Sequence, residues 1–136
     1  MTVRRNTLLG PDDITRHELA NGIVLLVREN YDAHSVVLTG AVQAGSVYDP
    51  PQKIGQAFFT AAALLRGTQT RDFAAIYEML EGNGASLSIS GGMHTVGFSG
   101  KSLGEDLPLL LDLLADALRR PAFPDGQLER LRGEIV

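Results

Sequence analysis

Among the residues of this 136-residue chain that could take part in catalysis or bind a metal, the three histidines are considered first. His17, His34 and His94 are the only ones, and no two of them are close enough in sequence to share a helical face. With few other convergent polar groups beside them, each is interpreted as a surface or strand residue rather than a metal ligand. We expect His94, inside a predicted strand, to be partly buried.

Serines and glycines offer two further kinds of site. Ser86, Ser88 and Ser90 alternate along one face of a predicted strand, but no histidine lies at a recognisable distance to activate them as nucleophiles. Residues 82–84 (Gly-Asn-Gly) and 91–92 (Gly-Gly) lack the spacing and the strand-to-helix context of a phosphate-binding loop. They are interpreted as turns, and the residues taken alone predict no active site.

Composition narrows the classes of function that remain. The chain has no cysteine, which excludes disulfides, iron–sulfur clusters and a thiol nucleophile. Its net charge is -4 and its basic residues form no stripe, so a nucleic-acid partner is not expected. No apolar run approaches the ~20 residues that span a bilayer, and the polar N-terminus lacks the apolar centre of a secretory signal. We therefore expect a cytoplasmic protein that does not bind a membrane.

The N-terminal part of the domain reads as strands. After an irregular arm over residues 1–14, extended runs at 15–19 and 23–29 flank an Asn-Gly pair, which is the strongest short signal for a β-hairpin. A valine-rich run at 35–44 predicts a third strand.

Two helices and a second hairpin are predicted next. Residues 55–65 are almost continuously apolar, which predicts a helix that is buried nearly all round. Apolar residues at helical spacing predict a second helix over 72–81. Runs at 86–90 and 93–99 predict a hairpin that turns at 91–92.

Two more helices complete the chain. Ser102 and Glu105 form a predicted capping box before one of them, and the other begins near Pro124 and still continues at Val136. The first is marked by leucines at helical spacing: Leu103, Leu107, Leu110, Leu111, Leu114 and Leu118. The element order βββααββαα predicts an α+β fold, an antiparallel sheet with helices packed on one face. We expect an arm at 1–14 and one domain at 15–136, a piece of something longer because it ends inside a helix.

Several segments, in their order and spacing, resemble the pitrilysin/insulinase family of zinc metallopeptidases, which includes the mitochondrial processing peptidase. They are residues 21–27 (NGIVLLV), 44–49 (AGSVYD), 55–68, 80–87 (LEGNGASL) and 105–116. The resemblance implies the N-terminal domain of a longer chain, in which repeated α+β domains pair into a clamshell around a peptide. It also implies a zinc ion held by an inverted His-x-x-Glu-His motif on the first helix, whose glutamate is the general base.

This sequence departs from the family at that motif. Phe58 and Ala62 fall on the two histidine positions and Ala61 falls on the glutamate, while the position of the third zinc ligand falls just beyond Val136. Zinc needs nitrogen, oxygen or sulfur donors, which phenyl and methyl groups do not supply. We therefore expect no catalytic residue, no cofactor and no metal site in this chain, which we predict to be inactive by itself. Phe58, Ala61, Ala62 and Leu65 are interpreted as one apolar core face of the helix.

Three functions remain open. The leading hypothesis is a non-catalytic subunit or domain that pairs with an active peptidase subunit, or with following domains, and helps to enclose a peptide substrate. The second is a fragment of a zinc endopeptidase whose catalytic residues lie elsewhere in the full chain. The third is a structural subunit, like the core subunits of the respiratory bc1 complex. In addition, Leu128, Leu131 and Ile135 form a stripe on the last helix that predicts a symmetric dimer.

Overall fold

A tight hairpin forms the first of two units into which the chain divides. The computed structural model describes residues 10–135, and the two units, with their boundary between Ala33 and His34, are described separately. In the first unit β1 (Thr15–Glu18) and β2 (Val24–Val27) pair antiparallel, and Gly22 adopts a positive φ of 85° in the turn between them. This confirms the predicted hairpin. A short 3-10 turn, η1 (Pro11–Asp13), precedes it in the arm expected to be irregular, and residues 1–9 of that arm lie outside the described residues.

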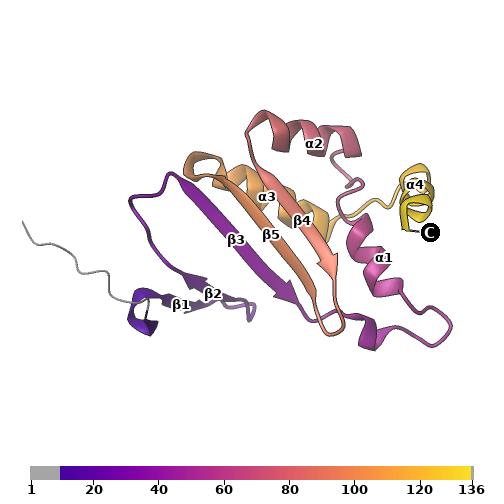
Figure 1. The fold of residues 1–136 in the computed structure, drawn as a ribbon, viewed down its shortest axis with the longest axis horizontal. Coiled ribbons are helices and arrows are strands. Elements are labelled where there is room, and N and C mark those ends of the chain that lie inside the picture. Colours follow the sequence, from indigo (N-terminus) through magenta and orange to yellow (C-terminus); the bar gives the residue numbers. More distant parts are fainter. Residues whose placement is uncertain (1–9, 136) are drawn as a thin grey trace, which may run out of the picture. The chain divides into compact units, whose positions relative to one another are not determined.

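A three-stranded antiparallel sheet is the centre of the second unit (Figure 1). It contains β3 (Ser35–Val42), β4 (Ser86–Gly91) and β5 (Val96–Leu103), in the order β3-β5-β4. The predicted α+β class and order of elements are confirmed, although the strands form two separate sheets of two and three strands.

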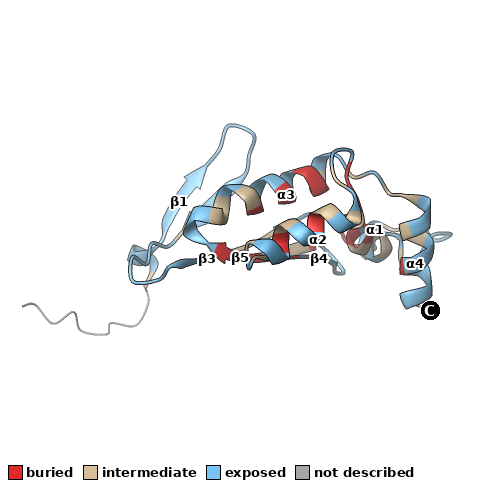
Figure 2. Cartoon of the chain, turned by 90° about the horizontal axis from the view of Figure 1, so that it is seen from above, coloured by how far each residue is buried: buried red, intermediate tan, exposed pale blue. Residues whose placement is uncertain are grey.

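Three helices cover one face of this sheet: α1 (Gln56–Ala63), α2 (Phe73–Gly82) and α3 (Leu107–Arg119). The fourth helix, α4 (Asp125–Ile135), packs against α1 instead. In Figure 2 α2 and α3 lie on the same side of the sheet, and both carry buried positions along their length. No helix within residues 10–135 is both long enough and apolar enough to cross a bilayer.

The two faces of the sheet differ in the size of their side chains. On the helix side Leu87, Ile89 and Val96 are buried, whereas the alternate positions of β4 are exposed serines. The Phe98 ring lies directly on Gly40, where a Cβ atom would come within 2.1 Å of the ring. Any larger residue at position 40 would therefore displace Phe98 from the core. Twelve buried residues form this core: Ala61, Leu64, Leu65, Ile76, Leu80, Leu87, Ile89, Val96, Leu110, Leu113, Leu114 and Ala117.

The second hairpin turns later than predicted. β4 continues to Gly91 and β5 begins only at Val96, so His94 lies in the intervening turn and is exposed. The expectation of a partly buried strand histidine is wrong. Carbonyl groups of this turn accept hydrogen bonds from a second 3-10 turn, η2 (Ser46–Tyr48), so the two turns are joined through their backbones.

The predicted capping box is also wrong. Ser102 belongs to β5, where it pairs with Val36, and its hydroxyl donates a hydrogen bond to the Leu103 carbonyl. Cross-strand pairing therefore extends the strand through the region where the helix was expected to begin. A 3-10 turn, η3 (Gly104–Asp106), follows, and α3 begins only at Leu107.

The carboxylate of Asp116 on α3 is completely buried and ties α3 to the connection between α1 and α2. The hydroxyl groups of Thr68 and Thr70 each donate a hydrogen bond to Oδ2 at 2.5 Å, and Arg71 Nη1 donates to the same oxygen at 3.0 Å. Arg120 Nε lies 2.9 Å from Oδ1 as an ion pair without hydrogen-bond geometry. Burial by itself would raise the pKa of this carboxyl, but the hydrogen bonds and the Arg120 charge together hold the pKa below its usual value.

Removal of this carboxylate should destabilise the protein strongly. We expect Asp116→Ala to lower the free energy of unfolding by about 3–5 kcal/mol, because it leaves the largely buried guanidinium of Arg71 without its internal partner. Urea unfolding followed by circular dichroism measures the change. Asp112→Ala is the matched control: Asp112 also pairs with Arg71 but is 56% exposed, so we expect a loss within about 1 kcal/mol. Equal losses in the two variants would contradict the structural role of Asp116.

The same carboxylate should make stability depend on pH. Because the folded pKa of Asp116 is lowered, its contribution is complete above the unfolded value of about 3.9 and is lost as the pH falls through the folded pKa. The difference in unfolding free energy between the wild type and Asp116→Asn should therefore be constant near neutral pH and shrink below about pH 4. A difference that grows on acidification would show that the pKa is raised instead.

Candidate functional site

Asp49 fixes the start of α1, the helix on which the predicted motif positions lie. One carboxylate oxygen accepts a hydrogen bond from the Gly55 N–H at 2.8 Å and the other accepts one from the Ala57 N–H at 2.9 Å. The first N–H groups of a helix have no partner within it, and a carboxylate both satisfies them and complements the positive end of the helix dipole. Gly55 enters the helix with a φ of 91°, a conformation that favours glycine.

The first turn of α1 also packs directly against the backbone of β4. A Cβ atom on Gly91 would lie 2.7 Å from the Cα atom of Phe58 and 3.2 Å from the Ala57 carbonyl oxygen. Only glycine permits this approach. At this point the helix approaches the sheet through backbone atoms.

The motif positions have different environments. Ala61 is 1% exposed and belongs to the core, Ala62 is half-buried, and the side chain of Phe58 is 49% exposed. The interpretation of these residues as one core face is wrong for Phe58, and the expectation of a helix buried nearly all round is wrong for the first turns of α1. The sheet and the neighbouring elements cover only part of the helix and leave Gln56, Phe58 and Thr60 exposed. It also ends at Ala63, and the buried Leu64 and Leu65 lie in the turn that leads to Thr68.

The residues around α1 do not fit a zinc ion. Phe58, Ala61 and Ala62 supply no donor atom, and residues 10–135 contain no group of three or more histidine, cysteine, aspartate or glutamate side chains that could hold a metal. His34 precedes β3 at one end of its ladder with β5, and His94 lies in the turn at the other end, so the second unit does not bring its histidines together.

The remaining sequence candidates are likewise separate. His17 is exposed on β1, in the first unit. Ser86, Ser88 and Ser90 lie on the exposed face of β4, and the Ser88 hydroxyl donates to the Ser99 carbonyl at 3.3 Å rather than to a base. Nothing in this arrangement activates a serine.

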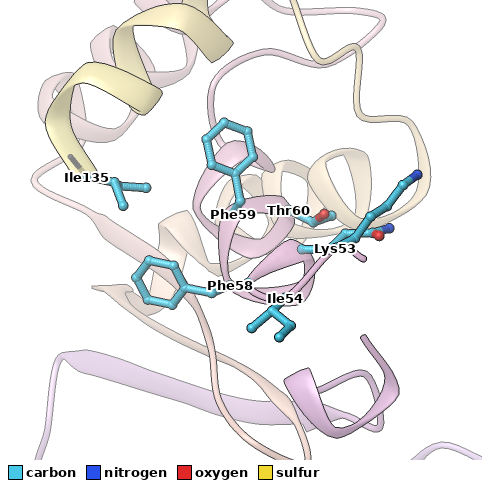
Figure 3. A pocket seen from close by; sticks show the side chains of 8 residues that line it. Lys53, Ile54, Phe58, Phe59, Thr60 and Ile135 are labelled. Carbon is cyan, nitrogen blue, oxygen red and sulfur yellow. The ribbon is translucent and has the colours of Figure 1, made fainter. Parts of the chain in front are cut away.

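A shallow, mainly apolar cleft of about 540 Å³ lies beside the first turns of α1 (Figure 3). Figure 3 shows Phe58 and Phe59 of α1 on the side of the helix where Ile135 of α4 lies. Eight residues line the cleft: Lys53, Ile54, Gly55, Gln56, Phe58, Phe59, Thr60 and Ile135. We name this surface the α1 cleft.

α4 forms one wall of the α1 cleft, and two contacts hold it in place. Leu131 is 4% exposed, and both oxygens of Glu134 accept hydrogen bonds from Arg66, just after α1. These hydrogen bonds lower the pKa of Glu134. The guanidinium of Arg66 also lies 5.2 Å above the centre of the Phe73 ring, so it joins α1, α2 and α4. One residue of the predicted dimer stripe, Leu131, is therefore already covered within the chain.

Sequence reasoning missed both Asp49 and the α1 cleft. Asp49 looked like part of a proline-containing loop, and no local pattern reveals that its carboxylate reaches a helix several residues away. Ile54 and Phe58 are four residues apart, the spacing of neighbours on a helix, and this is the one sequence signal that could have indicated a shared surface.

Comparison with known proteins gives consistent matches. The sequence profile described as "Insulinase (Peptidase family M16)" matches residues 24–136. Subunit 1 of the cytochrome b-c1 complex of Bos taurus is 30% identical over 95 residues, 70% of this chain and 20% of that protein. The mitochondrial-processing peptidase subunit beta of Saccharomyces cerevisiae is 28% identical, over 88% of this chain and 26% of that subunit. The chain thus spans about a quarter of the length of these relatives.

Two solved structures share the fold at the same level of identity. The peptidase M16 inactive domain from Pseudomonas fluorescens superposes with a TM-score of 0.82 and 26% identity, covering 90% of this chain and 30% of that one. Pitrilysin superposes with a TM-score of 0.79 and 26% identity, covering 92% of this chain and 14% of that one.

The unequal burial of the motif positions predicts unequal costs of substitution. We expect Ala61→Glu to lower the free energy of unfolding by about 2–4 kcal/mol, because it forces a larger, charged side chain into the core. Phe58→His should cost within about 1 kcal/mol, because the ring is half exposed. Urea unfolding of the two single variants measures both values. Equal costs would contradict the assignment of Ala61 to the core and of Phe58 to the surface.

Proposed function

The chain belongs to the insulinase family of peptidases (family M16), and on that premise we propose that it is a non-catalytic homologue of the family's zinc peptidases. In this role it pairs with an active M16 peptidase subunit, or with following domains of a longer protein, and helps to enclose a peptide.

The chemistry of α1 carries the proposal. The positions that resemble the family's zinc ligands and general base are Phe58, Ala61 and Ala62, and none of them offers an atom that binds zinc or accepts a proton from water. The anchoring of the helix by Asp49 and its close approach to Gly91 do not involve these side chains. The fold can therefore form without the catalytic side chains, as a non-catalytic role requires.

The relatives support a role in assembly without defining it. They include a domain described as inactive and both kinds of subunit, alpha and beta, of the mitochondrial-processing peptidase. A subunit without catalytic groups would still contribute a wall to the space in which an active partner holds its substrate.

A structural role is the second candidate, favoured by the similarity to subunit 1 of the cytochrome b-c1 complex. A piece of a zinc endopeptidase with its catalytic residues elsewhere is the third, and the small share of the relatives' length that this chain covers keeps it open. The symmetric dimer and the cytoplasmic location stay predictions.

Zinc binding tests the proposal directly. After dialysis against trace zinc, metal analysis of the purified chain should find far less than one equivalent, because α1 supplies no ligand. Stoichiometric zinc that a chelator removes would contradict the proposal. As a companion variant, Phe58→His/Ala61→Glu/Ala62→His should melt at a lower temperature and still cleave no peptide, because the position of the third ligand lies beyond this chain. Peptide cleavage by the triple variant would refute that reasoning.

A pairing experiment distinguishes the candidates. Co-expression of the full-length protein with an M16 homologue that keeps His-x-x-Glu-His should give a complex that cleaves peptides. The full-length protein alone should not. Cleavage by the full-length protein alone would favour the endopeptidase, whereas a stable complex without cleavage would favour the structural subunit.

A further inference from the structure

Three large apolar side chains are exposed to solvent at the α1 cleft. Ile54 is 87% exposed, Phe58 is 49% exposed and Ile135 is 46% exposed. They come from the loop before α1, from α1 itself and from α4, yet they line the same cleft. Apolar side chains that converge in this way from separate elements mark a binding surface more often than scattered single residues do.

The α1 cleft carries positive charge only. Lys53 is the only charged residue among the eight that line it, in a chain whose net charge is -4 and which contains just two lysines. Within residues 10–135, Lys53 takes part in no ion pair, since the paired cations there are arginines. Figure 3 shows its ammonium group extending away from Phe58, on the other side of the first turn of α1.

We propose that the α1 cleft binds an extended peptide segment that places a large apolar side chain against Phe58 and Ile135 and a carboxylate on Lys53. This proposal rests on the proposed function, because the cleft contains Phe58, one of the positions that resemble the family's zinc ligands. The occupant is a segment rather than a compact molecule, because the apolar wall and the ammonium lie on different sides of the first turn of α1.

A second copy of this chain fits the α1 cleft less well. A symmetric contact brings the same patch from both copies together. The lining contains a lysine and no carboxylate, so such a contact would place two Lys53 side chains in one interface with no partner from the lining. Electrostatic complementarity therefore favours an acidic partner.

Fluorescence anisotropy with labelled peptides tests the proposal on the 136-residue chain. The first probe has a central leucine–phenylalanine pair followed by two aspartates, flanked by glycine and serine. The second replaces the aspartates by lysines, and the third replaces the apolar pair by serines. We expect saturable binding of the first peptide and binding of the other two that is at least about tenfold weaker.

Two pairs of variants locate the binding. Phe58→Ser should weaken binding of the first peptide about tenfold, whereas Leu111→Ser, which removes a similarly exposed apolar side chain (44%) from α3, should not. Lys53→Glu should weaken binding of the aspartate peptide and strengthen that of the lysine peptide. Lys101→Glu, at the other lysine, on the exposed face of β5, should change neither. Circular dichroism checks that each variant is folded, and the Lys53 pair keeps the test informative if Phe58→Ser unfolds.

Three results would overturn the proposal: no saturable binding, equal binding of the three peptides, or equal effects of Phe58→Ser and Leu111→Ser. A dimer in sedimentation equilibrium that Phe58→Ser dissociates would show instead that a second copy covers the cleft. The proposed function fails by a different result: the chain would bind stoichiometric zinc or cleave a peptide. The anisotropy measurements detect neither of these, so the two failures are distinguishable.

Discussion

The carboxylate of Asp116 has no contact with solvent, and a buried charge must be paired. The connection between α1 and α2 and the end of α3 supply the groups that pair with it. Its partners Thr68, Thr70 and Arg71 lie in the connection between α1 and α2, while Arg120 follows at the end of α3. The segment that supplies the two hydroxyl groups cannot be helical, because it bridges to other parts of the backbone. One carboxylate therefore joins α3 to the connection that follows α1.

A second carboxylate determines where α1 begins. Asp49 accepts hydrogen bonds at the start of the helix, and Gly91 sets how closely the helix approaches β4. The start of α1 and its close approach to β4 thus depend on residues outside the motif positions, although Ala61 also packs in the core. An exposed position such as Phe58 can therefore change its side chain at little cost to the fold.

The local environment of each motif position also limits what it can become. Ala61 faces the core, so its small size is a packing requirement. Phe58 faces outward, where a histidine would be tolerated equally well, so packing does not explain the aromatic ring. An exposed ring opposite Ile135 is better explained by a partner than by stability.

The sequence alone was sufficient for the Asn-Gly hairpin, for the helix that Asp72 caps, and for the order of strands and helices, which depend mainly on neighbours in the chain. It also determined that Phe58, Ala61 and Ala62 carry no donor atoms. The sequence could not show that Ser102 belongs to a strand, because its ladder partner Val36 lies 66 residues earlier (102 − 36). Nor could it show which side of α1 faces outward or that Ile135 comes to line the same cleft as Phe58. Only the tertiary structure decided these points, because they depend on contacts between segments far apart in the chain.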